Sequence, residues 1–130
     1  MKPSAKEIEA VSLLDGSKRY TYFIKKVADW EEAWGLYDDG WLMSGDDEGN
    51  RAFPVWPAAE YASACAVQEW ENAKPKSISL DELMEEVLPS LSEEGLFVSV
   101  FLVPSEGLVA ANVLPSKLLK DLHQECALYE

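Results

Sequence analysis

The segment from Trp34 to Pro57 constrains the fold more than any other part of the chain. It holds three of the five tryptophans and two bends, of the Asp-Asp-Gly and Asp-Glu-Gly-Asn kind. Residues 32–37, 41–45 and 51–56 are rich in the aromatic and aliphatic side chains that suit a half-buried strand. Glycine accepts the positive φ that a tight turn requires, and aspartate tolerates it. The segment therefore predicts an antiparallel meander of three strands.

Apolar residues at helical spacing predict helices on both sides of the meander. Capping-box patterns open two of them, at Ser4 and at Ser79. Pro89 lacks the amide hydrogen that a helix interior uses, so we expect a kink or a break at Leu88. The predicted helices cover residues 4–15, 18–29, 57–71, 79–95 and 115–129.

A second group of strands is predicted near the C-terminus. Leu96–Val103 is apolar on both faces, as in a central strand, and Leu108–Val113 can return beside it after a Pro-Ser-Glu-Gly turn. Residues 76–78 suit a short edge strand or a plain connector. Hairpins that follow one another, with helices grouped between them, are typical of the α+β class. We expect residues 1–130 to form a single α+β domain, in which one mainly antiparallel sheet of about five strands packs against four to five helices.

The charge balance restricts the partners of the chain. It has 24 acidic residues against 11 basic ones, a formal net charge of −13. Nucleic-acid binding needs clustered Lys and Arg, and anionic membrane surfaces attract the same residues, so both are disfavoured. The longest apolar run, Leu96–Val103, is far too short to span a bilayer, and the N-terminus lacks the apolar core of a signal peptide. We expect a cytoplasmic protein whose acidic field steers a basic partner towards it.

No motif points to catalysis, to a cofactor or to a metal. His123 is the single histidine, and no nucleophile elbow, Walker loop, dinucleotide fingerprint or Cys-x-x-Cys pair is present. Cys65 and Cys126 are expected to be reduced thiols that pack as small apolar groups. The acidic bend at 46–50 has the wrong spacing for an EF-hand loop. We therefore name no catalytic, cofactor-binding or metal-binding residue, and expect a non-catalytic protein without a cofactor.

A series of short aromatic motifs resembles one family along nearly the whole chain. The motifs are Tyr20-x-Tyr22-Phe23, Val27-Ala28-Asp29, Trp34-Gly35-Leu36, Asp39-Gly40-Trp41, Pro54-Val55-Trp56-Pro57, Tyr61-Ala62, Trp70, Ile78-Ser79-Leu80-Asp81 and Leu88-Pro89. On these motifs the chain is similar to the DUF2750 family, a group of small bacterial proteins of unknown function. The resemblance implies a bacterial cytoplasmic protein of one domain, and it implies no activity, cofactor or catalytic residue.

Three functional hypotheses remain open. The first is a non-catalytic acidic binding module, an adaptor or an immunity-like inhibitor, because aromatic side chains anchor interfaces and charge steers association. The second is a small-molecule-binding protein or an unrecognised enzyme, with a pocket between helix 57–71 and the 32–56 meander. The third is a structural homo-oligomer, such as a homodimer. The candidate partner-binding surface for the first hypothesis consists of Trp41, Asp46, Asp47, Glu48 and Trp56.

Overall fold

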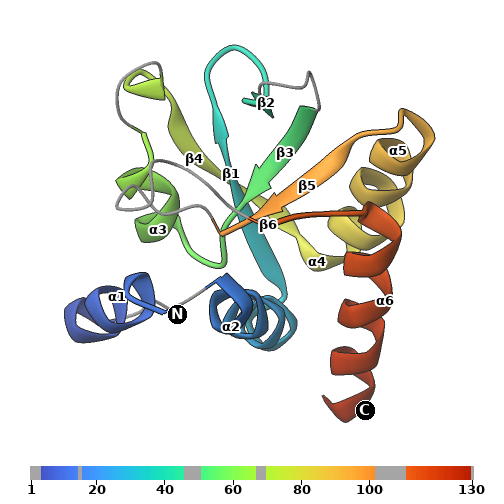
Figure 1. Cartoon of the computed structure of the whole chain (residues 1–130), viewed down its shortest axis with the longest axis horizontal. Coiled ribbons are helices and arrows are strands. Elements are labelled where there is room, and N and C mark those ends of the chain that lie inside the picture. The colour runs from blue at the N-terminus through green and yellow to red at the C-terminus, as the bar shows by residue number, and fades with distance from the viewer. Residues whose placement is uncertain (1–3, 15, 46–50, 67–69, 102–110, 130) are drawn as a thin grey trace.

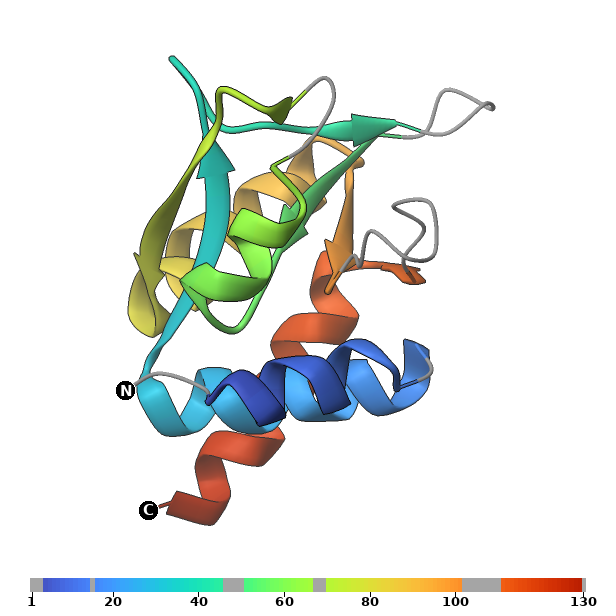
Figure 2. The same cartoon turned by 90° about the vertical axis from the view of Figure 1, so that its left-hand side faces the viewer.

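A computed structural model describes residues 4–14, 16–45, 51–66, 70–101 and 111–129. Two N-terminal helices, α1 (Ala5–Ser12) and α2 (Gly16–Trp30), lie side by side below the strands in both views (Figures 1 and 2). The predicted cap at Ser4 is confirmed, because the Ser4 hydroxyl accepts a hydrogen bond of 3.1 Å from the amide of Glu7. Apolar residues of α2, among them Phe23 and Val27, are fully buried. These helices therefore close the lower side of the core.

The strands form two sheets rather than the single sheet that the sequence predicted. The first pairs β1 (Glu32–Tyr37) with β4 (Lys74–Ser79) in antiparallel register. The second has the order β2-β3-β5-β6. Its strands are β2 (Ser44–Gly45), β3 (Arg51–Val55), β5 (Phe97–Val100) and β6 (Ala111–Val113). The α+β class is confirmed, and the single five-stranded sheet is wrong.

Among the residues that the structure describes, one pair joins the backbones of the two sheets. Trp34 and Trp56 exchange both of their backbone hydrogen bonds, each at 2.8 Å. The two sheets separate because β1 takes β4 as its ladder partner, whereas β3 pairs in parallel with β5. Pro54 fits within β3 because β2 pairs only as far as Ala52, so no strand needs the missing amide hydrogen on that side.

Two predicted hairpins are present in part. Tyr37 and Trp41 form an isolated bridge across the Asp-Asp-Gly bend, where Asp39 and Gly40 have φ values of 55° and 142°. The glycine and aspartate therefore adopt the positive φ expected of them. The C-terminal hairpin is confirmed by antiparallel pairing of β5 with β6. The predicted bend at 46–50 and the turn at 104–107 lie outside the described residues.

The remaining helices follow the predicted order, and the first of them is shorter than predicted. The described part of predicted helix 57–71 contains α3, which covers only Ala59–Ala64. The helix after β4 is interrupted before Pro89, as expected: α4 (Leu80–Glu82) continues as a π-helical turn, η2 (Leu83–Val87), and then as α5 (Leu88–Glu93). The chain ends with α6 (Pro115–Cys126) and the 3₁₀ turn η4 (Ala127–Tyr129). In the part of the chain that the structure describes, no helix has the length and apolar character needed to cross a membrane.

The core fills the space between the sheets and the helices. Its largest fully buried apolar side chains include Trp56, Phe23 and Phe101. A guanidinium is buried with them, because Arg19 is only 2 % exposed. Arg19 Nε donates to the carbonyl oxygen of Phe101 at 3.2 Å, and Nη1 donates to that of Leu14 at 2.5 Å. The buried cation thus ties α2 to the end of β5.

Candidate functional site

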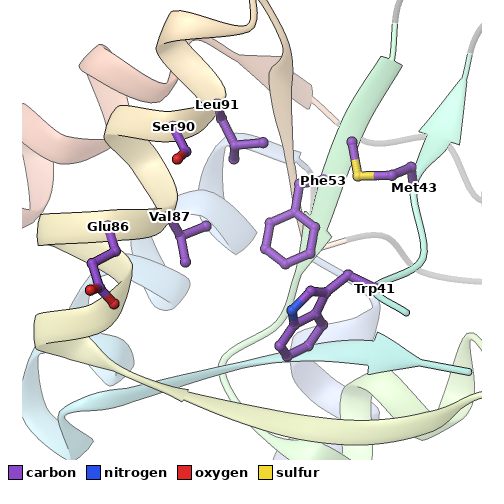
Figure 3. A pocket seen from close by; sticks show the side chains of 7 residues that line it. All are labelled: Trp41, Met43, Phe53, Glu86, Val87, Ser90 and Leu91. Carbon is purple, nitrogen blue, oxygen red and sulfur yellow. The ribbon is translucent and has the colours of Figure 1, made fainter. Parts of the chain in front are cut away.

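An apolar groove opens between the meander and the helix that follows β4 (Figure 3). One wall is made by residues at and near β2 and β3, and the other by η2 and α5. The two sets of side chains face one another across a cavity of about 300 Å³. The lining residues are Trp41, Met43, Phe53, Glu86, Val87, Ser90 and Leu91.

Trp41 is the most prominent side chain of the groove. It is 37 % exposed, which places a large part of an indole in water. Its ring packs edge-to-face against Phe53, with centroids 5.6 Å apart. On its other side it meets Gly35, where an added Cβ would lie only 2.9 Å from Cζ3 of the indole. The absence of a side chain at Gly35 therefore allows the indole to lie close to β1.

A second aromatic residue extends the exposed apolar surface beyond the groove. Tyr37 is also 37 % exposed and packs edge-to-face on Trp41, with centroids 5.4 Å apart and an interplanar angle of 87°. The Lys76 ammonium lies 4.3 Å from the Tyr37 centroid and 5.3 Å from that of Trp41. Distances below about 6 Å are those at which an ammonium interacts with an aromatic face. We call Tyr37, Trp41 and Lys76 the aromatic–lysine cluster.

An acidic side chain lies at this apolar surface. Glu86, an exposed residue of η2, is part of the groove lining, whereas the preceding Glu85 lines a different cavity beside α6. Asp38 and Asp39 follow Tyr37 directly in the chain and are exposed. A ligand that places an apolar group in the groove therefore meets the negative charge of Glu86.

The predicted partner-binding residues have different outcomes. Trp41 lies in the groove wall. Trp56 is 0 % exposed, so its inclusion in the surface was wrong: it is a core residue held by its bridge to Trp34. The acidic residues 46–48 lie outside the described part of the chain. The groove that opens on the meander faces η2 and α5 rather than α3. The predicted pocket beside helix 57–71 involves residues outside the described part of the chain and stays a prediction.

Several residues of the site were missed by sequence reasoning. The sequence predicts only strands at Tyr37, Phe53 and Met43, and a short edge strand or a connector at Lys76. One signal was present: an isolated glycine within a strand pattern, here Gly35, marks a close approach of another group to the backbone. No local pattern could have indicated that Val87 and Leu91 face the meander, because that contact is made between distant segments.

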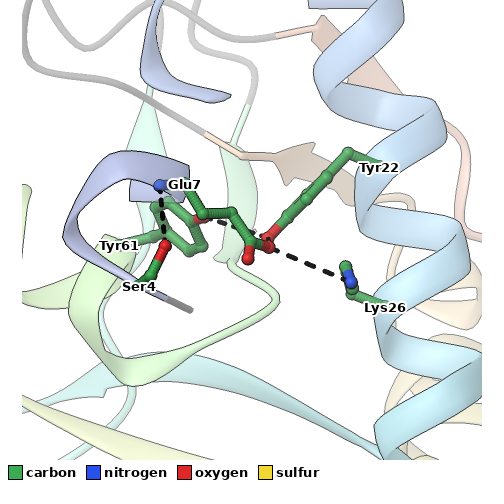
Figure 4. Close-up of polar contacts among 5 residues, drawn as sticks. All are labelled: Ser4, Glu7, Tyr22, Lys26 and Tyr61. Atoms are coloured by element: carbon green, nitrogen blue, oxygen red, sulfur yellow. Dashed lines mark hydrogen bonds and ion pairs between the residues drawn. The ribbon is translucent and has the colours of Figure 1, made fainter. Parts of the chain in front are cut away.

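A polar cluster elsewhere holds the helices together (Figure 4). The Tyr22 hydroxyl donates to the Glu7 carboxylate and lies 3.0 Å from the Tyr61 hydroxyl. Since Tyr22 uses its only proton on Glu7, Tyr61 must be the donor to Tyr22. Lys26 Nζ lies 3.9 Å from Glu7. Burial, followed by the hydrogen bond to Glu7, raises the pKa of Tyr22, so this phenol stays protonated and links α1, α2 and α3 rather than acting as a base.

A mixed cavity of about 420 Å³ lies between α6 and the segment around η2. Its lining includes His123, Cys126, Glu31, Asp81 and Glu85. Within the described ranges, no three such side chains are arranged to hold a metal ion. The cavity is therefore lined by side chains of the kinds that bind metals, but among the described residues they do not form a coordination site.

The fold and the groove define a small α+β protein with an aromatic-lined surface site. The chain belongs to the DUF2750 family, described as a protein of unknown function, whose family model matches residues 20–122. The sequence-based identification of this family is thus confirmed. No curated protein and no solved structure matches the chain. The whole groove and the aromatic–lysine cluster fall within the matched region, whereas Glu7 of the polar cluster precedes it.

Proposed function

We propose that this protein is a non-catalytic binding module that takes up a basic segment of a partner protein and holds one apolar side chain of that segment in the groove. The observation that supports this most directly is Trp41, a large aromatic side chain that is 37 % exposed in the wall of an apolar cavity. Tryptophan is enriched among the residues that dominate binding energy at protein interfaces.

The size of the groove favours a side chain over a metabolite. Its volume of about 300 Å³ is at the lower end of the range for pockets that enclose small molecules. Five of its seven lining side chains are apolar or aromatic, and Ser90 supplies one hydroxyl. Such a groove suits an aliphatic or aromatic side chain presented by a peptide.

The charge distribution favours a basic partner. The chain has a net charge of −13, and Glu86 lies in the groove lining. Complementary charge raises the association rate and disfavours acidic competitors. The attraction is screened by salt, so we expect the affinity to fall as ionic strength rises.

Selection from a phage-displayed library of random peptides tests the proposal. Peptides are selected on the wild-type protein and counter-selected on Trp41→Ala; Leu13→Ala is the matched control, because Leu13 is an apolar residue that is 79 % exposed on another part of the surface. We expect the retained peptides to share Lys or Arg with one aromatic or branched aliphatic residue. They should bind Leu13→Ala as well as wild type.

Three results would contradict the proposal. They are retained peptides that bind Trp41→Ala equally well, a preference for acidic peptides, and a stable dimer by light scattering in which Trp41 is shielded.

Glu86→Gln, compared with Glu9→Gln on α1, tests the contribution of charge to the binding affinity; both glutamates are exposed helical residues. The triple change Asp46→Asn, Asp47→Asn, Glu48→Gln asks whether the acidic bend adds to binding, and unchanged affinity would exclude it.

A further inference from the structure

We infer that Tyr37 and Trp41 form a binding site for an organic cation, and that Lys76 occupies this site in the absence of a ligand. Two aromatic rings at 87° to each other make two walls of a box, and the Lys76 ammonium lies 4.3 Å and 5.3 Å from their centroids. This inference rests on the proposed function in one respect: it identifies the group that a basic partner would place beside the groove.

The strand register places Lys76 at this position. Lys76 lies opposite Gly35 in the β1–β4 ladder, and Tyr37 is its diagonal neighbour on the same face. Because Gly35 has no side chain, the indole of Trp41 lies against β1 at the level of Lys76. The site therefore depends on three local features: the glycine at position 35, the bend before Trp41, and a lysine on the paired strand. Together they place the Lys76 ammonium beside the two rings.

The chemistry of the box favours an alkylated ammonium over the resident lysine. Aromatic faces attract a cation through the ring quadrupole, and quaternary ammonium groups are the cations that aromatic cages typically recognise. A primary ammonium is strongly hydrated and loses more on leaving water. Lys76 is an exposed residue, and both rings are 37 % exposed, so a cation from solution has access to the same surface.

Lys76 must leave before another cation enters. A site whose open form is only partly populated shows a reduced apparent affinity, and removal of the intramolecular competitor restores it. We therefore expect Lys76→Met to bind tetramethylammonium more tightly than wild type does. The expected decrease in Kd is about two- to fivefold, which corresponds to the strength of an exposed cation–aromatic contact.

The experiment is a titration with tetramethylammonium chloride, referenced to sodium chloride at equal ionic strength. Binding is followed by the NMR signal of the Trp41 indole N–H, assigned with Trp41→Phe. Lys76→Arg keeps a cation in the box and should behave as wild type. Lys25→Met removes the same charge from an exposed position on α2 and should also match wild type. Tyr37→Leu removes one wall and should weaken binding to Lys76→Met protein.

The inference is overturned if Lys76→Met shows no saturable shift, if its Kd equals that of wild type, or if Lys25→Met produces the same gain. The probe contains no peptide, so the two proposals fail separately. Tetramethylammonium binding without enrichment of basic peptides would leave the cation site and remove the proposed function. Enrichment of basic peptides without tetramethylammonium binding would leave the proposed function and remove the cation site.

Discussion

Arg19 shows how a single buried cation can fix two loop carbonyls. Its guanidinium donates to Leu14 on one side and to Phe101 on the other, and Phe101 has a positive φ of 62°. A non-glycine residue in this region is strained, so its backbone needs to be held by its surroundings. The hydrogen bonds from Arg19 therefore stabilise a conformation that the local sequence does not favour.

We predict that Arg19→Met lowers the free energy of unfolding by about 2–4 kcal/mol, since it leaves buried carbonyl groups without their donors. Urea denaturation measures this change. Arg51→Met, at an exposed position at the start of β3, is the matched control and should change the stability by less than about 0.5 kcal/mol. Equal effects of the two substitutions would show that burial of Arg19 is not the cause.

Cys65 gives a prediction about pH. Burial raises the pKa of its thiol from 9.0 to about 11, and a hydrogen bond with Trp56 offsets part of that rise. Because the folded state holds this proton more tightly than the unfolded state does, the contribution of Cys65 to stability is complete below pH 9 and is lost as the pH rises towards about 11.

The different burial of the two cysteines predicts different rates of alkylation. Iodoacetamide at pH 8, with mass spectrometry, should label half-buried Cys126 well before Cys65. Faster labelling of Cys65 would contradict its burial.

At the scale of elements, Gly35 couples β1 to the bend that presents Trp41. We predict that Gly35→Ala displaces the indole, because the added Cβ would lie 2.9 Å from it. The ring can move into solvent, so the loss of stability should stay within about 1 kcal/mol. Acrylamide quenching in a variant that keeps only Trp41 should increase.

Gly95→Ala is the control for Gly35→Ala. Gly95 has a φ of 71°, and a Cβ added there would meet nothing within 4 Å, so its substitution strains the backbone without touching Trp41. It should lower stability by about 1–2 kcal/mol and leave the quenching unchanged. Quenching that responds equally to both substitutions would show that the Gly35 contact does not position the indole.

The elements were more predictable than their pairing. Strand and helix positions follow from local patterns, so β1, β3, the hairpin β5–β6 and the interruption before Pro89 could be anticipated. The predicted strand 41–45 is reduced to Ser44–Gly45, and the three-stranded meander does not form one sheet because β1 pairs with β4. The pairing of β1 with β4 and of β3 with β5 joins segments that are far apart, and no local pattern contains it. The same reason explains the error at Trp56: both Trp41 and Trp56 suit a strand, and only the tertiary arrangement decides which one is buried.

At the scale of the whole molecule, the excess of acidic residues opposes the compact state. Asp81, Glu82, Glu85 and Glu86 are all exposed on one helical segment, where like charges four residues apart destabilise by about 0.2–0.5 kcal/mol per pair. We predict that adding sodium chloride raises the thermal midpoint, because screening weakens this repulsion. Sucrose at equal osmolality is the control for solute exclusion. A midpoint that falls with salt would show that attractive ion pairs outweigh the repulsion.

The exchange of hydrogen bonds between Trp34 and Trp56 has a mechanical consequence. Phe53, in one wall of the groove, belongs to the larger sheet, whereas the opposite wall continues directly from β4 of the smaller one. We therefore expect the two walls to close on a bound peptide by a small rotation about these two hydrogen bonds. We expect closure on a peptide to slow amide hydrogen exchange at these two tryptophans, although neither of them touches the ligand.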